Sequence, residues 1–301
     1  MSILITSLLS TLTVVCVTVI ATMGLTLIFK TSTTTNFAQG IIAALGCYVV
    51  ADMMNKHGVN FYVSILIGLI VGILIGLFID LVIFRSGRFV NPVSKQIITM
   101  GIMTLILGIV PLVFGTPEAI PFESFAEGIL VTKTPDGELV ITKHALVCIA
   151  ITVVVITAIF LLLRYSKWGL SVRAVANNEF TAEFMGINTH KVTAMSWSIA
   201  AALGVLAAVM FAGSGVAISS TFMTTIQINA FLAGILGGFA TFYGPIIGAI
   251  IIPLANTFIG YFSIYIPDLS RWSMVIVYVL MLIVILIKPQ GLFGKKAIKK
   301  V

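Results

Sequence analysis

The repetition of long apolar runs constrains this chain more than any other feature. Such runs recur from residue 3 to residue 287, and short polar segments separate them. A helix needs about 20 apolar residues to cross the ~30 Å hydrocarbon core of a bilayer. Hydrophobic residues make up 59% of the chain and charged residues only 9%, whereas soluble proteins carry about a quarter charged residues. The chain is therefore predicted to be an all-α, polytopic inner-membrane protein that forms a single transmembrane domain over residues 1–301.

We expect about eight or nine transmembrane helices. The candidate spans are residues 3–29, 35–54, 61–84, 97–114, 145–163, 194–212, 226–242, 244–262 and 272–287. The run 41–54 is too short to cross alone, so its helix is expected to begin near Thr35 or Asn36. Gly237, Gly238 and Pro245 favour an unwound segment at membrane depth, so one or more spans should be broken or re-entrant.

Lysine and arginine are unevenly distributed between the connecting segments. Most of them lie at Lys30, in the loop 85–95, in the segment 164–193 and in the C-terminal tail. Because positive charge marks cytoplasmic loops, these segments should be cytoplasmic. The N-terminus is then outside, as the start of a retained first span, and the C-terminus is inside. The loop of about 115–144 is extracytoplasmic, and its TKTPDGE stretch predicts a turn or small hairpin. The net charge of +7 therefore does not indicate nucleic-acid binding.

The segment 164–193 is the longest polar interruption in the second half of the chain. It contains a short helix that Asn177 or Asn178 can cap and that Gly186 can end. Its apolar residues recur at i, i+4 and i+7 and so share one face: Phe180, Phe184 and Ile187. The hypothesis is that this helix docks into another protein. The alternative is a surface helix that lies on the membrane with its phenylalanines in lipid.

Polar and small residues inside the spans suggest two further roles. Asn36 and Gln39 fall in the first turns of a span, where amides are costly unless they meet protein or a wet cavity. They indicate a broken helix that lines a translocation path, or an ordinary loop and first turn at the interface. Glycines at GxxxG spacing favour close helix packing, within the chain rather than in a dimer. The residues concerned are Gly68, Gly72 and Gly76, and Gly244 and Gly248.

The chain lacks the motifs of an enzyme. No P-loop GxxxxGK[ST], HExxH or CxxC pair is present, so neither ATP hydrolysis nor metal or cofactor binding is expected. The cysteines should be small core residues. The three histidines, His57, His144 and His190, are expected to be exposed at span ends or in loops. Acids come near the membrane only at Asp52 and Asp80, which disfavours ion-coupled transport and calls for an outside energy source.

Four patches together resemble the permease subunits of branched-chain amino acid ABC transporters, of the LivH type. They are GLTLIF at 24–29 with NFAQG at 36–40, RA at 173–174 with EFMGIN at 183–188, AGILGG at 233–238 with GPIIG at 244–248, and KPQGLFG at 288–294. Each patch is weak alone, but the four follow the family's order over nearly the whole chain. Two features depart from the family's pattern: the polar link 30–35, and Ile41 where an acidic residue is common.

The resemblance implies a second, homologous permease, two ABC ATPase subunits on the cytoplasmic side and an extracytoplasmic solute-binding protein. It identifies the segment 164–193 as the coupling loop. The candidate ATPase-coupling residues are Arg173, Asn178, Phe180, Glu183, Phe184, Gly186 and Ile187. The candidate substrate-pathway residues are Asn36, Gln39, Gly40, Asn229, Gly234, Gly237 and Gly238.

The solute that the resemblance implies is a branched-chain or related hydrophobic amino acid. Permeases for urea and short amides belong to the same superfamily and stay an alternative. A stand-alone secondary transporter or channel is a third interpretation, and it would transport without any ATPase.

Overall fold

The computed structural model describes residues 2–85, 91–115, 120, 122–134, 137–266 and 269–294. Arg88 of the expected basic loop, Asp136 of the expected turn and the lysines from residue 295 onward lie outside these ranges. The elements in chain order are α1 (Ser2–Ser32), α2 (Gln39–Asn55), α3 (Phe61–Phe78), the π-helix η1 (Ile79–Phe84), α4 (Pro92–Phe114), β1 (Ile129–Thr134), β2 (Gly137–Thr142), α5 (Lys143–Tyr165), α6 (Lys167–Asn177), α7 (Glu179–Phe184), α8 (Thr189–Ala212), α9 (Thr224–Gly237), α10 (Tyr243–Tyr261), the 3-10 turn η2 (Phe262–Ile264) and α11 (Leu269–Ile287).

Seven helices of the described chain are long and apolar enough to cross a membrane. They are α1, α3 with η1, α4, α5, α8, α10 with η2, and α11. The shorter helices α2 and α9 have 17 and 14 residues. At 1.5 Å per residue, α9 is only about 21 Å long, which is less than the ~30 Å of the hydrocarbon core. The all-α, polytopic class is confirmed, and α2 and α9 are the two incomplete helices.

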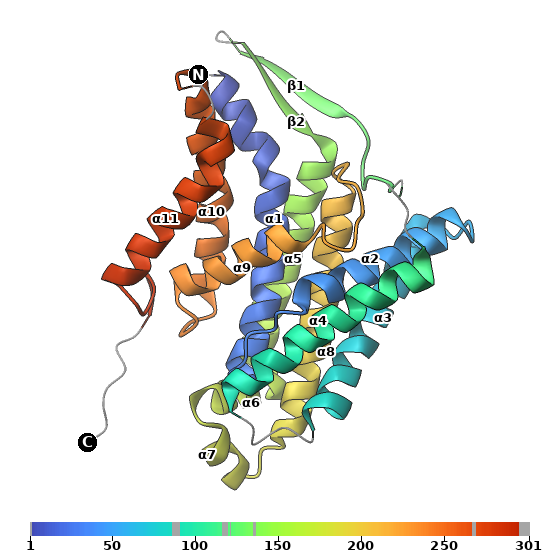
Figure 1. Ribbon diagram of the computed structural model, residues 1–301, viewed down its shortest axis with the longest axis vertical. Coiled ribbons are helices and arrows are strands. Elements are labelled where there is room, and N and C mark those ends of the chain that lie inside the picture. The colour runs from blue at the N-terminus through green and yellow to red at the C-terminus, as the bar shows by residue number, and fades with distance from the viewer. Residues whose placement is uncertain are drawn as a thin grey trace.

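Helices α1 and α8 form the centre of the bundle, and the other spans surround them (Figure 1). In the most apolar stretch of α1, 83% of the residues are buried, and in that of α8, 72% are buried. The corresponding share is 17–33% in the other five spans. A position at the centre explains why α1 tolerates threonines at membrane depth. The hydroxyls of Thr18, Thr22 and Thr26 each donate to the carbonyl four residues earlier, so each of these three hydroxyls has a partner.

Glycines let α3 approach α8 and α2 closely. Gly68, Gly72 and Gly76 are all buried on one face of α3. A Cβ atom on Gly76 would lie 2.5 Å from the backbone oxygen of Trp197 in α8. Backbone cannot swing aside as a side chain can, so this contact requires glycine.

The hairpin and the helices of the segment 164–193 lie at opposite ends of the molecule (Figure 1). Strands β1 and β2 pair antiparallel, with Ile129 opposite Thr142, which confirms the predicted hairpin. The hydroxyl of Thr6 donates to the carbonyl of Glu138 over 3.3 Å and so holds the hairpin beside the start of α1. Helices α6 and α7 lie beyond the other end of α1.

We expect Gly76→Ala to destabilise the protein by about 1–3 kcal/mol, because the added methyl group meets backbone. Gly108→Ala is the matched control, since a Cβ there would have nothing within 4 Å. Thermal unfolding in detergent, followed by tryptophan fluorescence, measures both. Equal midpoints for the two variants would contradict the assigned α3–α8 contact.

Candidate functional site

A cavity of about 380 Å³ lies where the two incomplete helices begin. The chain enters α2 through residues 33–38 and α9 through residues 213–223. The lining residues are Leu25, Thr35, Asn36, Phe37, Gly40, Ile41, Met103, Leu107, Ser220, Thr221, Thr224, Gln227, Ile228, Phe231 and Leu232. The volume falls in the range of small-molecule sites. Amides and hydroxyls come from the starts of α2 and α9, and apolar side chains come also from α1 and α4. None of these lining residues is charged, so the cavity suits a small solute with a polar head and an apolar body.

Gln227 joins the start of α9 to the start of α2. Its Oε1 accepts the backbone N–H of Gly40 over 2.6 Å. Its Nε2 donates to the carbonyl of Phe37 and, over 3.4 Å, to that of Asn36. One side chain thus supplies partners for three backbone groups at a helix break. Sequence reasoning missed Gln227, although an amide in the apolar run 226–242 was a signal of the same kind as Asn36.

The contact with Gln227 explains the glycine at position 40. A Cβ atom on Gly40 would overlap Oε1 of Gln227. Only glycine therefore lets the amide reach the backbone N–H. The candidate pathway residue Gly40 lies at the cavity and has a defined structural reason to be glycine.

Asn36 lies at the cavity, whereas Gln39 faces the bundle centre. The Oδ1 atom of Asn36 accepts the N–H of Ala38 over 3.0 Å, and its Nδ2 donates to Oε1 of Gln39 over 3.0 Å. The Nε2 atom of Gln39 donates to the carbonyl of Ala200 in α8 over 2.6 Å. Both amides are buried, and the oxygen and the nitrogen of each have a hydrogen-bond partner within the protein. Gln39 therefore anchors the start of α2 to α8 rather than lining the cavity.

Asn229 and the glycines at 234, 237 and 238 are not among the residues that line this cavity. Asn229 accepts a hydrogen bond from the hydroxyl of Tyr278 in α11 over 3.0 Å. A Cβ on Gly234 would overlap the ring of Phe239, and a Cβ on Gly237 or Gly248 would overlap backbone of the facing helix of the α9–α10 pair. Gly238 has a φ of +86° and ends α9. Gly237, Gly244 and Gly248 therefore hold α9 and α10 together.

The KPQGLFG segment closes over the end of α9. The N–H of Leu292 donates to the carbonyl of Leu236 over 2.7 Å, and that of Phe293 donates to the carbonyl of Gly237 over 3.1 Å. A Cβ on Gly291 would lie 2.6 Å from the Cα atom of Gly238. Two patches far apart in the sequence therefore meet and fix the C-terminal end of α9.

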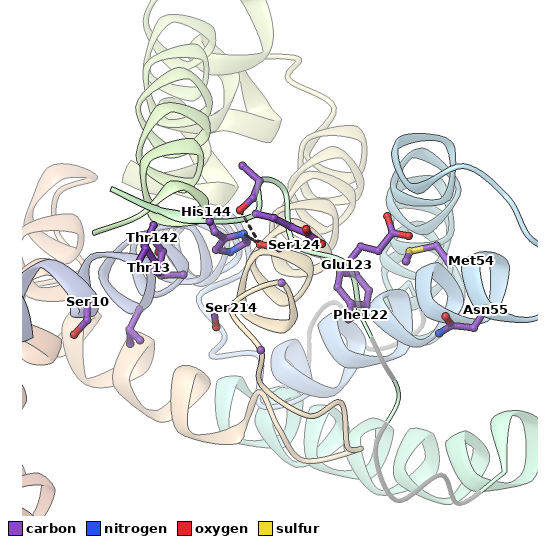
Figure 2. Close-up of a pocket in the computed structure, with 17 residues that line it drawn as sticks. Ser10, Thr13, Met54, Asn55, Phe122, Glu123, Ser124, Thr142, His144 and Ser214 are labelled. Atoms are coloured by element: carbon purple, nitrogen blue, oxygen red, sulfur yellow. Dashed lines mark hydrogen bonds between the residues drawn. The ribbon is translucent and has the colours of Figure 1, made fainter. Parts of the chain in front are cut away.

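A second cavity, of about 890 Å³, opens at the hairpin end of the molecule. Figure 2 shows His144 and Ser124 between Ser10 and Thr13 of α1 and Met54 and Asn55 at the end of α2. We call this cavity at the hairpin end the outer cavity, and the one at the starts of α2 and α9 the inner cavity. Residues 213–215 line the outer cavity, and Ser220 and Thr221 line the inner cavity. The segment 213–223 therefore runs from the outer cavity to the inner cavity.

His144 is buried, so the expectation of an exposed histidine is wrong at this position. Its Nε2 lies 2.9 Å from the carbonyl oxygen of Met210, and its Nδ1 accepts the N–H of Phe125 over 3.2 Å. A carbonyl can only accept and an N–H can only donate, so the proton belongs on Nε2. The imidazole ties residues 124–125 to the end of α8, a tertiary contact that loop position alone cannot reveal.

Two helices, rather than one, occupy the segment 164–193. Helix α6 was not expected, and Ser166 caps it by accepting the N–H of Gly169 over 2.9 Å. Asn178 caps α7 by accepting the N–H of Thr181 over 3.0 Å. At its other end, Gly186 has a φ of +83°, and the N–H of Ile187 donates to the carbonyl of Ala182 over 3.0 Å. This is a glycine-terminated helix end, as predicted from Asn178 and Gly186.

The apolar surface of α7 differs from the expected one. Phe184 is 90% exposed, Met185 is 79% exposed and Phe180 is 64% exposed. Ile187 instead packs against the core, so the prediction that it shares a face with the phenylalanines is wrong. The helix ends at Phe184, and the reversed backbone at Gly186 turns Ile187 inward. Arg173 in α6 and Glu183 in α7, the charged coupling candidates, are exposed.

The described residues contain no obvious centre for metal or thiol chemistry. In the ranges searched, no group of three or more His, Cys, Asp or Glu side chains could hold a metal ion. Cys16, Cys47 and Cys148 are free and buried. Asp52 pairs with Lys56 over 2.6 Å at the end of α2, and Asp80 accepts from the hydroxyl of Thr193 over 3.2 Å.

Comparison with known proteins identifies one family along nearly the entire chain. Residues 7–285 match the family described as "Branched-chain amino acid transport system / permease component". No solved structure matches the chain.

Curated relatives carry permease names. The chain is 28% identical over 293 residues to the probable branched-chain amino acid transport permease protein LivH of Methanocaldococcus jannaschii, covering 92% of this chain and 88% of that protein. It is 25% identical to the high-affinity LivH permease of Salmonella typhimurium, covering 92% and 91%. It is 26% identical to the BraD permease of Pseudomonas aeruginosa over 54% of this chain and 52% of that protein.

The cavity geometry predicts how cysteines introduced into α9 will react. Thr224→Cys should react readily with a small maleimide, because Thr224 is exposed at the cavity. Asn229→Cys should react far more slowly, because position 229 is buried toward Tyr278. The unaltered chain, whose three cysteines are buried, gives the background rate. Equal rates at positions 224 and 229 would contradict the assigned orientation of α9.

Proposed function

The chain belongs to the branched-chain amino acid transport permease family, and we propose that it is the membrane subunit through which an ABC importer passes branched-chain or related hydrophobic amino acids. The family match over residues 7–285 is the observation that carries this proposal. A permease of such an importer works with ATPase subunits and a solute-binding protein. The finer arrangement proposed is one second, homologous permease, two ATPases on the cytoplasmic side and the binding protein outside.

The proposed orientation places α6 and α7 in the cytoplasm and the β1–β2 hairpin outside. Lys and Arg concentrate at Lys30, near η1 and in the segment 164–193. These segments lie at the end of the bundle opposite the hairpin (Figure 1). The positive-inside rule then gives an outside N-terminus and a cytoplasmic C-terminus in the inner membrane.

Helix α7 is the proposed docking element for an ATPase. Phe180, Phe184 and Met185 form an apolar patch that water would otherwise surround. Exposed patches of this kind mark sites of protein contact. The caps at Asn178 and Gly186 fix a short helix that can be pushed as a unit, so closure of the ATPases can be transmitted to α6 and α8.

The inner cavity is the proposed site through which the solute passes in this subunit. Its amides and hydroxyls can exchange hydrogen bonds with an ammonium or carboxylate group, and its apolar side can accept a branched side chain. The absence of charge among these lining residues favours release over tight binding. The large apolar share of the lining favours a hydrophobic amino acid over urea, which has no apolar body.

Phe184→Asp should uncouple the ATPases from uptake. Truncation of an aromatic hot-spot residue costs about 2 kcal/mol or more, which corresponds to roughly a thirtyfold loss of affinity. Pull-down of the ATPases and ATP-driven uptake of tritiated leucine into proteoliposomes measure the effect.

Two controls accompany this variant. Phe184→Leu keeps an apolar side chain, and Tyr265→Asp adds a carboxylate at an exposed position of the opposite end. Unimpaired docking and uptake by Phe184→Asp would remove α7 from the proposed coupling role.

Gln227→Leu should lower the rate of leucine uptake by about tenfold. The substitution leaves up to three backbone groups without a partner, and each buried group left unpaired costs about 1–3 kcal/mol. Asn229→Leu, on the same helix but turned toward α11, should lower the rate less. Initial rates with the matching binding protein measure both variants. A larger effect at Asn229 than at Gln227 would argue against the inner cavity as the passage.

A further inference from the structure

Helix α4 is mostly exposed, but it buries one narrow stripe that begins with two polar residues. The buried positions are Lys95, Thr99, Ile102, Ile106 and Val110. Asn91 caps this helix by accepting the N–H of Val93 over 3.1 Å, so α4 starts at Pro92 and Lys95 lies inside it rather than in a loop. Thr99 is 0% exposed and Lys95 only 8% exposed, and a buried lysine is costly in a membrane helix unless it has a function there.

Thr99 and Gln96 hold the segment that precedes α2. The N–H of Phe37 donates to the hydroxyl of Thr99 over 3.1 Å. The amide of Gln96 donates to the hydroxyl of Thr35 over 2.6 Å. The carbonyl of Phe37 accepts from Gln227. Phe37, which lines the inner cavity, is therefore held by α4 through its N–H and by α9 through its C=O.

Lys95 lies one helical turn before Thr99 on the same stripe, and it faces the proposed coupling segment, residues 164–193. It lines a small space of about 30 Å³ with Asp80 of η1, Glu179 at the start of α7, and His190 and Thr193 of α8. Thr193 donates to Asp80 over 3.2 Å, so η1 and α8 are already joined there. The first turns of α4 thus share this space with η1, α7 and α8 at one end and bond to the segment before α2 at the other.

We propose that the start of α4 is a strut that carries movement of α7 and α8 to Phe37 and the inner cavity, with Lys95, Gln96 and Thr99 as positioning residues. This inference rests on the proposed function. An α-helix is rigid over one turn, so a displacement at Lys95 reaches Thr99 undiminished. The hydrogen bonds to Thr35 and Phe37 then move the start of α2 relative to α9.

The test uses the permease assembled with its partner permease, ATPases and binding protein in proteoliposomes. Thr99→Val removes the hydroxyl and keeps the shape. Thr99→Ser keeps the hydroxyl. Thr104→Val is the matched control, because the hydroxyl of Thr104 bonds only to its own helix at Met100, over 3.1 Å. The readouts are ATP hydrolysis, uptake of tritiated leucine, their ratio, and the thermal midpoint of the complex.

We expect Thr99→Val to lower leucine uptake by up to about tenfold while ATP hydrolysis stays within about twofold, because one hydrogen bond contributes about 0.5–1.5 kcal/mol. Thr99→Ser should restore the ratio, and Thr104→Val should leave it unchanged. Gln96→Leu, at a half-buried position, gives a second arm if Thr99→Val fails to assemble, and it should raise the ATP hydrolysed per leucine in the same way.

A normal ratio in Thr99→Val and Gln96→Leu beside an active wild type overturns the strut. Parallel loss of hydrolysis, uptake and thermal midpoint also overturns it, because that pattern indicates only structural stabilisation. No ATP-driven leucine uptake by the wild-type assembly would instead overturn the proposed function itself.

Discussion

Backbone N–H and C=O groups inside a bilayer need partners within the protein, and the two interrupted helices depend on meeting this requirement. Before α2, Asn36 accepts the N–H of Ala38 and Thr99 accepts that of Phe37. Gln227 accepts the N–H of Gly40 and donates to the carbonyl of Phe37. Amide and hydroxyl side chains thus supply partners for the backbone where helical partners are lost. The cavity exists because these side chains supply the hydrogen-bond partners that the interrupted helices lack there.

Close packing and hydrogen bonds hold the two ends of α9 in different ways. Lipid tails give helices no hydrophobic reason to associate, so contact depends on small residues and tight fit. Gly237, Gly244 and Gly248 hold α9 against α10, and Leu292 and Phe293 bind the carbonyls at its C-terminal end. Its N-terminal end is held by the hydrogen bonds of Gln227 to the start of α2 and by the burial of Ile226 and Ala230. The two ends of α9 are therefore held by different kinds of contact.

Local signals in the sequence were sufficient where the structure depends on neighbouring residues. Apolar run length predicted the long spans, and Asn178 with Gly186 predicted both ends of α7. Local signals could not predict tertiary contacts. Gln227 and Thr99 bond to the start of α2 from other helices of the bundle. His144 is buried where residues 124–125 fold against it. Helical periodicity failed at Ile187, because the backbone reverses at Gly186. The glycines at 234–238 match equally well a lining or a packing role in the sequence, and only their contacts separate the two.

Neutral hydrogen bonds are well suited to a break that must hold and yet rearrange. A buried ion pair at Phe37 would leave an uncompensated charge on separation, at about 3–5 kcal/mol. An apolar seam would leave voids when its two sides part. An amide or hydroxyl contributes only about 0.5–1.5 kcal/mol net and can find another backbone partner nearby. The start of α2 can therefore be firmly placed in one arrangement and still exchange for a second, which is what the proposed passage of solute through the cavity between α2 and α9 would require.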